Sequence, residues 1–204
     1  MRDWKNIPLP EKMQHMEVDE RGFPVPFIVL RDKEGKPKFT ANDTVKVAFC
    51  RTKKMCAICG KAMFKDMWVA GGVLSAFHPQ GVYIDTPVHR ECGEYALQVC
   101  PYLAFTAYNG KVDIKKLQAK ADGVILVDPT VMSNRPPMFV FAKISGFAVQ
   151  GFNHAIVPVK PFLDIEFWND GKKLSLDVAE NILKEKAGID KKFVIDKKGV
   201  CKEV

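Results

Sequence analysis

Two short metal-ligand motifs constrain this chain more than any other feature. Cys56 and Cys59 form a Cys-x2-Cys pair, and His89 and Cys92 form a His-x2-Cys pair after a gap of 29 residues. Two thiolates three positions apart on a tight turn can hold one Zn²⁺ at about 2.3 Å. Gly60 directly follows the first pair and permits the positive φ that such a turn needs. The sequence therefore predicts one zinc site with four protein ligands.

The second pair is expected in the first turn of a helix. A three-residue offset places His89 and Cys92 on the same helix face, and a helix N-terminus stabilises a thiolate. The start of this helix is predicted at residues 85–87, where Asp-Thr-Pro offers an N-cap followed by proline. Its end is predicted at Pro101.

A turn, a β-hairpin and a ligand-bearing helix together describe a treble-clef zinc core. The hairpin is expected from a strand over 62–70 and a partner strand over 73–77, separated by Gly71-Gly72. Because four protein ligands fill a tetrahedral shell and leave no position for water, the zinc would be structural and not catalytic.

The rest of the chain predicts an α+β fold with β-rich flanks around this core and a C-terminal amphipathic helix. Residues 1–22 resemble an irregular arm, 23–122 the zinc-binding α+β core, and 123–204 a β-rich lobe with the last helix. One continuous domain is the alternative to this division. The further elements expected are a hairpin over 24–40, helices over 44–53, 113–120 and 176–187, and strands over 123–127, 138–149, 155–159 and 162–167.

Three other cysteines carry weaker signals. Cys50 precedes the first motif by six residues and is a less favoured substitute ligand, since it lies in a predicted helix. Cys100 lies on the apolar face of the ligand-bearing helix and is expected in the core. Cys201 lies in the lysine-rich tail and is expected to be an exposed thiol.

Charge points toward an anionic partner. The chain has a net charge of +7, and two stretches, 44–65 and 129–163, contain no acidic residue. A locally one-signed surface attracts nucleic acid or an acidic protein face, although a solvated basic face without a partner is an equally simple explanation. The residues expected to contact the partner are Arg51, Lys53, Lys54, Lys61 and Lys65.

Several function classes lack their sequence signatures. The chain shows no phosphate loop, dinucleotide-binding glycine motif or nucleophile elbow, so no small-molecule cofactor is expected. The mean hydropathy is −0.09 and no apolar run approaches the roughly 20 residues of a membrane-spanning helix. The N-terminus does not resemble a signal peptide, so the expected location is cytoplasmic, where six cysteines favour metal or free thiols over disulfides.

A treble clef also underlies the His-Asn-His nucleases, which makes nuclease activity one alternative. His78 and Asp85 lie in the relevant interval, but the Asp-His pair usual in that class is missing and His89 is committed to zinc. His78 is better explained as a polar loop residue before Pro79. His15 and His154 are likewise expected in an exposed arm and in a turn, respectively.

Several segments of the chain resemble an uncharacterised family of phage- and prophage-associated bacterial proteins. The similar segments follow in the same order over most of the chain and are 21–27, 56–60, 87–92 with 100–103, and 167–171. The resemblance implies a viral or mobile-element origin and a shared zinc site, without implying an activity. We therefore expect a non-enzymatic, zinc-stabilised binding protein that acts on nucleic acid or a nucleic-acid-handling host complex. The alternative is an inhibitor that docks directly on a host defence or regulatory protein.

Overall fold

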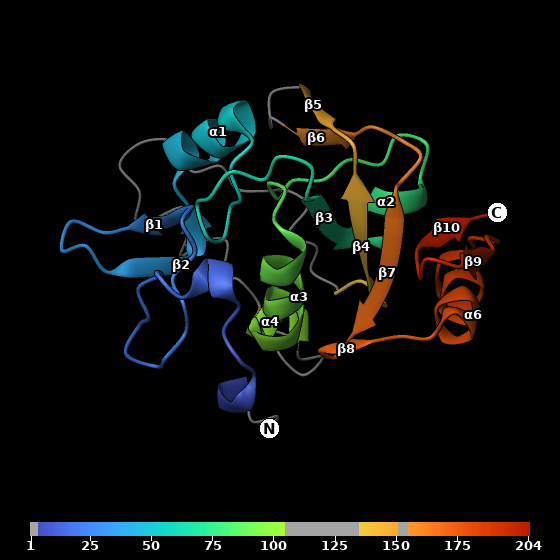
Figure 1. The fold of residues 1–204 in the computed structure, drawn as a ribbon, viewed down its shortest axis with the longest axis horizontal. Helices are drawn as coiled ribbons and strands as arrows, with labels where there is room; N and C mark the ends of the chain where they lie inside the picture. The colour runs from blue at the N-terminus through green and yellow to red at the C-terminus, as the bar shows by residue number, and fades with distance from the viewer. Residues whose placement is uncertain (1–3, 105–134, 151–154) are drawn as a thin grey trace.

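The computed structural model describes residues 4–104, 135–150 and 155–204 and shows an α+β architecture (Figure 1). Its centre is a four-stranded antiparallel sheet in the order β3-β4-β7-β8. The strands of this sheet are β3 (Met67–Gly72), β4 (Phe139–Ile144), β7 (Asp164–Asn169) and β8 (Lys172–Lys173). The sheet thus combines β3 from the range 23–122 with three strands from 123–204.

Strand β4 is buried because both faces of the sheet are covered. Phe141 lies on the face covered by α3 (Arg90–Val99), and it stacks on Trp68 with ring centroids 4.7 Å apart. The opposite face presents Phe167 of β7, which contacts Phe77 of α2 (Val73–Phe77). A strand buried on both sides consists almost entirely of apolar residues, which explains the Phe-Val-Phe-Ala segment of β4.

The C-terminal elements pack against the second face of the sheet. Helix α6 (Leu176–Ala187) follows Ser175 and ends at Gly188, whose φ of 64° is the left-handed conformation that suits glycine. The strands β9 (Phe193–Ile195) and β10 (Cys201–Glu203) then form a hairpin. The Phe193 ring reaches the core edge-on to Phe167, with centroids 4.9 Å apart.

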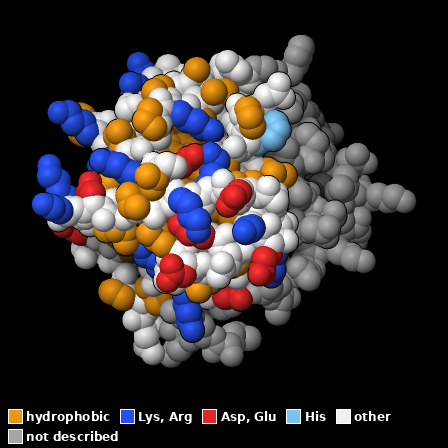
Figure 2. Space-filling model, turned by 90° about the vertical axis from the view of Figure 1, so that its right-hand side faces the viewer, with side chains coloured by type: hydrophobic (Ala, Val, Ile, Leu, Met, Phe, Trp, Pro, Cys, Tyr) orange, Lys and Arg blue, Asp and Glu red, His pale blue; other side chains and the backbone are white. Residues whose placement is uncertain are grey.

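Lysines and acids are interspersed on the face that these C-terminal elements form (Figure 2). Lys192 pairs with Glu180 at 2.7 Å, and Lys202 pairs with Asp196 at 3.4 Å. The lysine-rich tail is therefore partly neutralised by its own neighbours.

The N-terminal part confirms the predicted hairpin and first helix. Strands β1 (Val29–Arg31) and β2 (Pro37–Asn42) pair antiparallel, and α1 (Thr44–Lys53) follows. The Asp43 carboxylate accepts hydrogen bonds from the backbone of Val45 and Lys46, which caps α1. The remaining described elements are the 3₁₀ turns η1 (Trp4–Asn6) and η2 (Glu11–Met13), the helix α4 (Pro101–Ala104), and the paired strands β5 (Phe147–Gln150) and β6 (Ala155–Pro158).

The predicted hairpin over 62–77 is wrong in its second half. Residues 73–77 form helix α2, and the partner of β3 is the distant strand β4. The buried residues of α2 are Val73, Ala76 and Phe77, which is the i, i+3, i+4 spacing of a helix face. The first strand is also shorter than predicted, since β3 begins only at Met67.

The predicted start of the ligand-bearing helix is also wrong. Helix α3 begins at Arg90, with His89 as its N-cap residue. The preceding segment is extended because Val88 exchanges two backbone hydrogen bonds with Trp68, at 2.8 and 2.9 Å. The predicted end is confirmed, since α3 stops at Val99 and Pro101 opens the short helix α4.

Some expectations fall outside the described residues, namely the helix over 113–120, the strand over 123–127 and His154. None of the described helices is long and apolar enough to cross a membrane.

Candidate metal centre

The structure brings all four predicted metal ligands together. The ligand atoms of Cys56, Cys59, His89 and Cys92 lie within 4.8 Å of one another, and all four residues are buried. No other such group of three or more cysteine, histidine or acidic residues occurs in the described part of the chain. We refer to these four residues as the ligand quartet.

The Cys56–Cys59 turn is built by short-range backbone hydrogen bonds. Gly60 N–H donates to the Cys56 carbonyl at 2.9 Å, and Cys56 N–H donates to the Lys61 carbonyl at 2.8 Å. Gly60 has a φ of 71°, as the sequence predicted for this turn. A Cβ at Gly60 would also lie 2.8 Å from the Phe27 ring, so glycine is required here both for its conformation and for its size.

The second half of the quartet is positioned by β3. The Trp68–Val88 pairing holds the chain beside β3 immediately before His89, and His89 N–H then donates to the Cys56 sulfur at 3.4 Å. Cys92 follows in the first turn of α3, where backbone N–H groups favour a thiolate. Both predicted pairs therefore meet, although His89 itself lies just outside the helix.

The His89 ring is oriented from both of its nitrogen atoms. Its Nδ1 lies 3.3 Å from the Cys59 sulfur and 4.0 Å from the Cys92 sulfur. Its Nε2 lies 3.0 Å from the Ala62 carbonyl oxygen. A proton on Nε2 donates to that carbonyl and leaves Nδ1 free to ligate, which is the outer-shell arrangement common at metal-bound histidines.

These distances suit a tetrahedral ion. Ligands about 2.0–2.3 Å from a central Zn²⁺ lie roughly 3.5–3.8 Å from one another. The separations of 3.3 and 4.0 Å around His89 Nδ1 bracket that range. Three sulfurs and one imidazole nitrogen also form a soft ligand set that selects zinc or a similar ion over magnesium or calcium.

The close approach of these groups shifts their pKa values. Hydrogen bonds from the Cys56 and Cys92 thiols hold the pKa of Cys59 well below its ordinary value. Burial alone lowers the pKa of His89, but the contacts with Cys56 and Cys59 outweigh it and raise that pKa to about 10. A divalent ion would displace these protons and take over the stabilisation of the thiolates.

The three other cysteines lie outside the quartet. Cys50 is buried in α1, and burial raises its thiol pKa to about 11, so it stays protonated near neutral pH. Cys100 is half-buried at the end of α3. The prediction of an exposed Cys201 is wrong, because this residue is 5% exposed and its N–H donates to the buried Asp164 carboxylate.

The N-terminal arm packs against the elements that carry the ligand quartet, which the sequence did not reveal. Met13 is 1% exposed, and Lys12 pairs with Glu91 on α3. The exposed ring of His15 places its Nε2 3.0 Å from the Cys59 carbonyl oxygen. The sequence signal for this docking was a few apolar residues, such as Met13 and Met16, within a polar stretch.

Four of the five predicted contact residues are exposed around the Cys56–Cys59 turn. We call them the basic cluster, and they are Lys53, Lys54, Lys61 and Lys65. Met63 N–H donates to the Lys54 carbonyl at 3.0 Å, which places the end of α1 beside the loop that carries Lys65. Within the described ranges none of the four lysines forms an ion pair.

Arg51, the fifth predicted contact residue, has a different environment. Its guanidinium donates to the Thr86 hydroxyl at 3.2 Å and to the Ile84 carbonyl at 2.6 Å. These bonds tie α1 to the segment that leads into the second ligand pair. We therefore assign Arg51 a structural role and leave it out of the basic cluster.

Sequence reasoning missed Phe64, which lies within the basic cluster. Its side chain is 84% exposed, and its φ of 44° is a left-handed conformation that is rare for an aromatic residue. Such a conformation costs about 1–2 kcal/mol. The sequence signal was weak, because Phe64 follows Met63 and precedes Lys65, and an aromatic residue beside another apolar residue resembles an ordinary core position.

The structure also places His78, the residue on which nuclease activity would depend. It is exposed at the end of α2, and its Nδ1 accepts a hydrogen bond from the Gln80 backbone at 3.1 Å. It does not belong to the ligand quartet, and it serves as a loop residue, as predicted.

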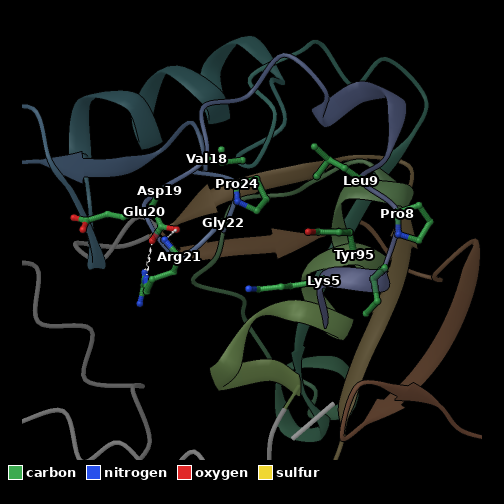
Figure 3. A pocket seen from close by; sticks show the side chains of 11 residues that line it. Lys5, Pro8, Leu9, Val18, Asp19, Glu20, Arg21, Gly22, Pro24 and Tyr95 are labelled. Atoms are coloured by element: carbon green, nitrogen blue, oxygen red, sulfur yellow. Dashed lines mark hydrogen bonds and ion pairs between the residues drawn. The ribbon is translucent and has the colours of Figure 1, made fainter. Parts of the chain in front are cut away.

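A separate open depression of about 570 Å³ lies between the N-terminal arm and α3 (Figure 3). The Tyr95 hydroxyl points into it, and apolar residues such as Leu9 and Pro24 line its wall. Its two cationic and two acidic side chains balance one another, and neither the ligand quartet nor the basic cluster contributes to it.

Comparisons with protein-family models, curated proteins and solved structures found no match to this sequence.

Proposed function

We propose that this protein is a zinc-stabilised, non-enzymatic module that binds nucleic acid through the basic cluster. The metal part of the proposal rests on the three-sulfur, one-nitrogen quartet and on the Ala62 contact that orients His89. Four protein ligands complete a tetrahedral shell, so the ion would hold the Cys56–Cys59 turn to α3 and leave no position for a reacting water.

The arrangement fits a modified treble clef. The cysteine turn and the ligand-bearing helix α3 are the two ligand-carrying parts of that motif. In the interval between them, β3 pairs back with Val88, and helix α2 replaces the second strand of the expected hairpin. The Trp68–Val88 pairing takes the place of the hairpin, because it brings the chain back to the ligand site directly before His89.

The observation that carries the nucleic-acid proposal is that four exposed lysines, none of which forms an ion pair within the described ranges, lie around the Cys56–Cys59 turn. The acidic residue closest in sequence is Asp66, whose carboxylate is occupied by the Trp68 indole N–H at 2.9 Å and the Arg90 backbone N–H. Within the described residues Asp66 forms no ion pair with the basic cluster, and a phosphate backbone is a polyanion that such a lysine-rich surface attracts.

The test is fluorescence anisotropy of labelled DNA and RNA, single- and double-stranded, with zinc-loaded protein across a salt series. The double charge reversal Lys53→Glu/Lys54→Glu should weaken binding and reduce the salt slope by about 1.4 for a single strand. Lys197→Glu/Lys198→Glu is the matched control, since these adjacent lysines are also exposed and lie in the β9–β10 turn. Equal binding by the wild type and both variants would refute this assignment.

A protein partner is the second candidate, and the outer face of α1 favours it. Val45 is 77% exposed and Phe49 is 45% exposed, and they lie one helical turn apart. Such a face suits docking on a host protein, which is the action of an inhibitor. A partner captured from a nuclease-treated bacterial lysate, lost on Val45→Asp and retained at high salt, would support this candidate over nucleic acid.

The cellular setting of either function would be a bacterial cytoplasm containing a phage or prophage. That proposal rests on the family resemblance and on six cysteines without a disulfide among those described.

A further inference from the structure

Phe64 is held in an exposed position by a turn that is anchored at both ends. Asp66 N–H donates to the Met63 carbonyl at 2.8 Å, which closes the turn around Phe64 and Lys65. Met63 is 1% exposed and bonds to the Lys54 carbonyl, while the Asp66 carboxylate bonds to Trp68. The backbone below Phe64 is therefore fixed, and the ring is held in solvent.

This exposure is unusual among the described residues, where Phe64 is the most exposed large apolar side chain. An aromatic ring in a left-handed conformation is retained at the expense of stability, and such strain is concentrated at functional positions. Packing does not account for the residue, because a ring that is 84% exposed makes few contacts with the core.

The surroundings of the ring indicate its ligand. Lys65 is its neighbour in the turn, and Lys54 lies across the backbone hydrogen bond from Met63. Flexible cations around a fixed aromatic ring form the combination that binds single-stranded nucleic acid, where lysines follow the phosphates and the ring stacks on a base. In a duplex the base faces are already covered, so the ring gains nothing there.

We propose that Phe64 stacks on an unpaired base and makes the basic cluster selective for single-stranded nucleic acid. This inference rests on the proposed nucleic-acid binding function and specifies its ligand. Since every base offers an aromatic face, the selectivity should depend on strandedness much more than on sequence.

The experiment compares single-stranded and duplex oligonucleotides of equal length in the anisotropy assay, with both DNA and RNA. The informative variant is Phe64→Gly, because glycine adopts the left-handed turn without strain and preserves the fold. It should weaken single-strand binding about tenfold, leave duplex binding unchanged and keep the salt slope of the wild type. Phe64→Trp should retain single-strand binding.

The matched control is Phe39→Ala, which removes a partly exposed aromatic ring from β2 and should have no effect. Thermal melting of Phe64→Gly at or above the wild-type temperature would establish that its binding loss is not due to unfolding. If Phe64→Gly binds single strands as well as the wild type while Lys53→Glu/Lys54→Glu binds them weakly, the stacking inference fails and the proposed function stands. If the wild type binds no nucleic acid even at low salt, both fail.

Discussion

The substitution Gly93→Ala tests how closely the ligand-bearing helix must approach the sheet. Gly93 follows Cys92 in α3 and faces β4. A Cβ at this position would lie 2.4 and 2.6 Å from two atoms of the Phe141 ring and 3.0 Å from a methyl group of Val88. The ring cannot move aside easily, since Phe141 is 0% exposed and stacked on Trp68.

Two opposing effects determine the result. Alanine in a helix interior is favoured over glycine by about 1 kcal/mol. Overpacking of a rigid core costs roughly 1–3 kcal/mol, and three simultaneous close contacts place this case near the upper end. The expected net destabilisation is therefore about 2 kcal/mol, or a melting temperature lower by about 4–8 °C for a chain of this size.

The assay is thermal and denaturant unfolding at a fixed excess of zinc, together with zinc affinity by chelator competition. Zinc affinity should also fall, because displacement of α3 moves Cys92 relative to the other ligands. The control is Gly35→Ala, where a φ of 80° causes strain but no atom lies within 4 Å of the new Cβ. Gly35→Ala should cost about 1 kcal/mol without changing zinc affinity. A neutral or stabilising Gly93→Ala would refute the close-packing argument.

Two further predictions follow from the metal centre and from the docking of α6. Metal analysis should find one zinc per chain. Because zinc affinity contributes directly to folding, a strong chelator or Cys59→Ser should lower the melting temperature by well over 10 °C. An unchanged melting curve would contradict a structural metal. The pKa of Glu180 is lowered by its hydrogen bonds with Lys192 and with the Phe193 backbone. A lowered native pKa stabilises the fold only while the carboxylate is ionised. Glu180→Gln should therefore destabilise the protein at pH 7, and the stability difference between wild type and variant should fade as the pH falls below about 4.5. A stability difference that persists undiminished at pH 3 would exclude the ionised carboxylate as its cause.

Local chemistry made several features of this protein predictable. The quartet could be named because the three-residue spacings of its cysteines and histidine encode ligand geometry directly. Helix α1 could be bounded because Asp43 caps it within the same short segment. The end of α3 followed from Pro101, which cannot continue the preceding helix. In each case the deciding interaction joins residues close together in the chain.

Long-range contacts decided the remainder. The partner of β3 lies about 70 residues further on, in β4, and no local pattern specifies such a pairing. Helix α3 begins at Arg90 and not at the predicted position, because Val88 pairs with Trp68 through backbone hydrogen bonds. The burial of Cys201 depends on its bond to Asp164, 37 positions away.

The candidate binding surface also depends partly on the local sequence and partly on long-range contacts. The sequence by itself determined that the metal ligands and a run of lysines share one region of the chain. Only the tertiary structure decided which cations face solvent, since Arg51 donates to Thr86 whereas the four lysines are exposed. The exposure of Phe64 was also a tertiary outcome, because the turn that presents it is anchored through Lys54 and Trp68, which belong to other elements.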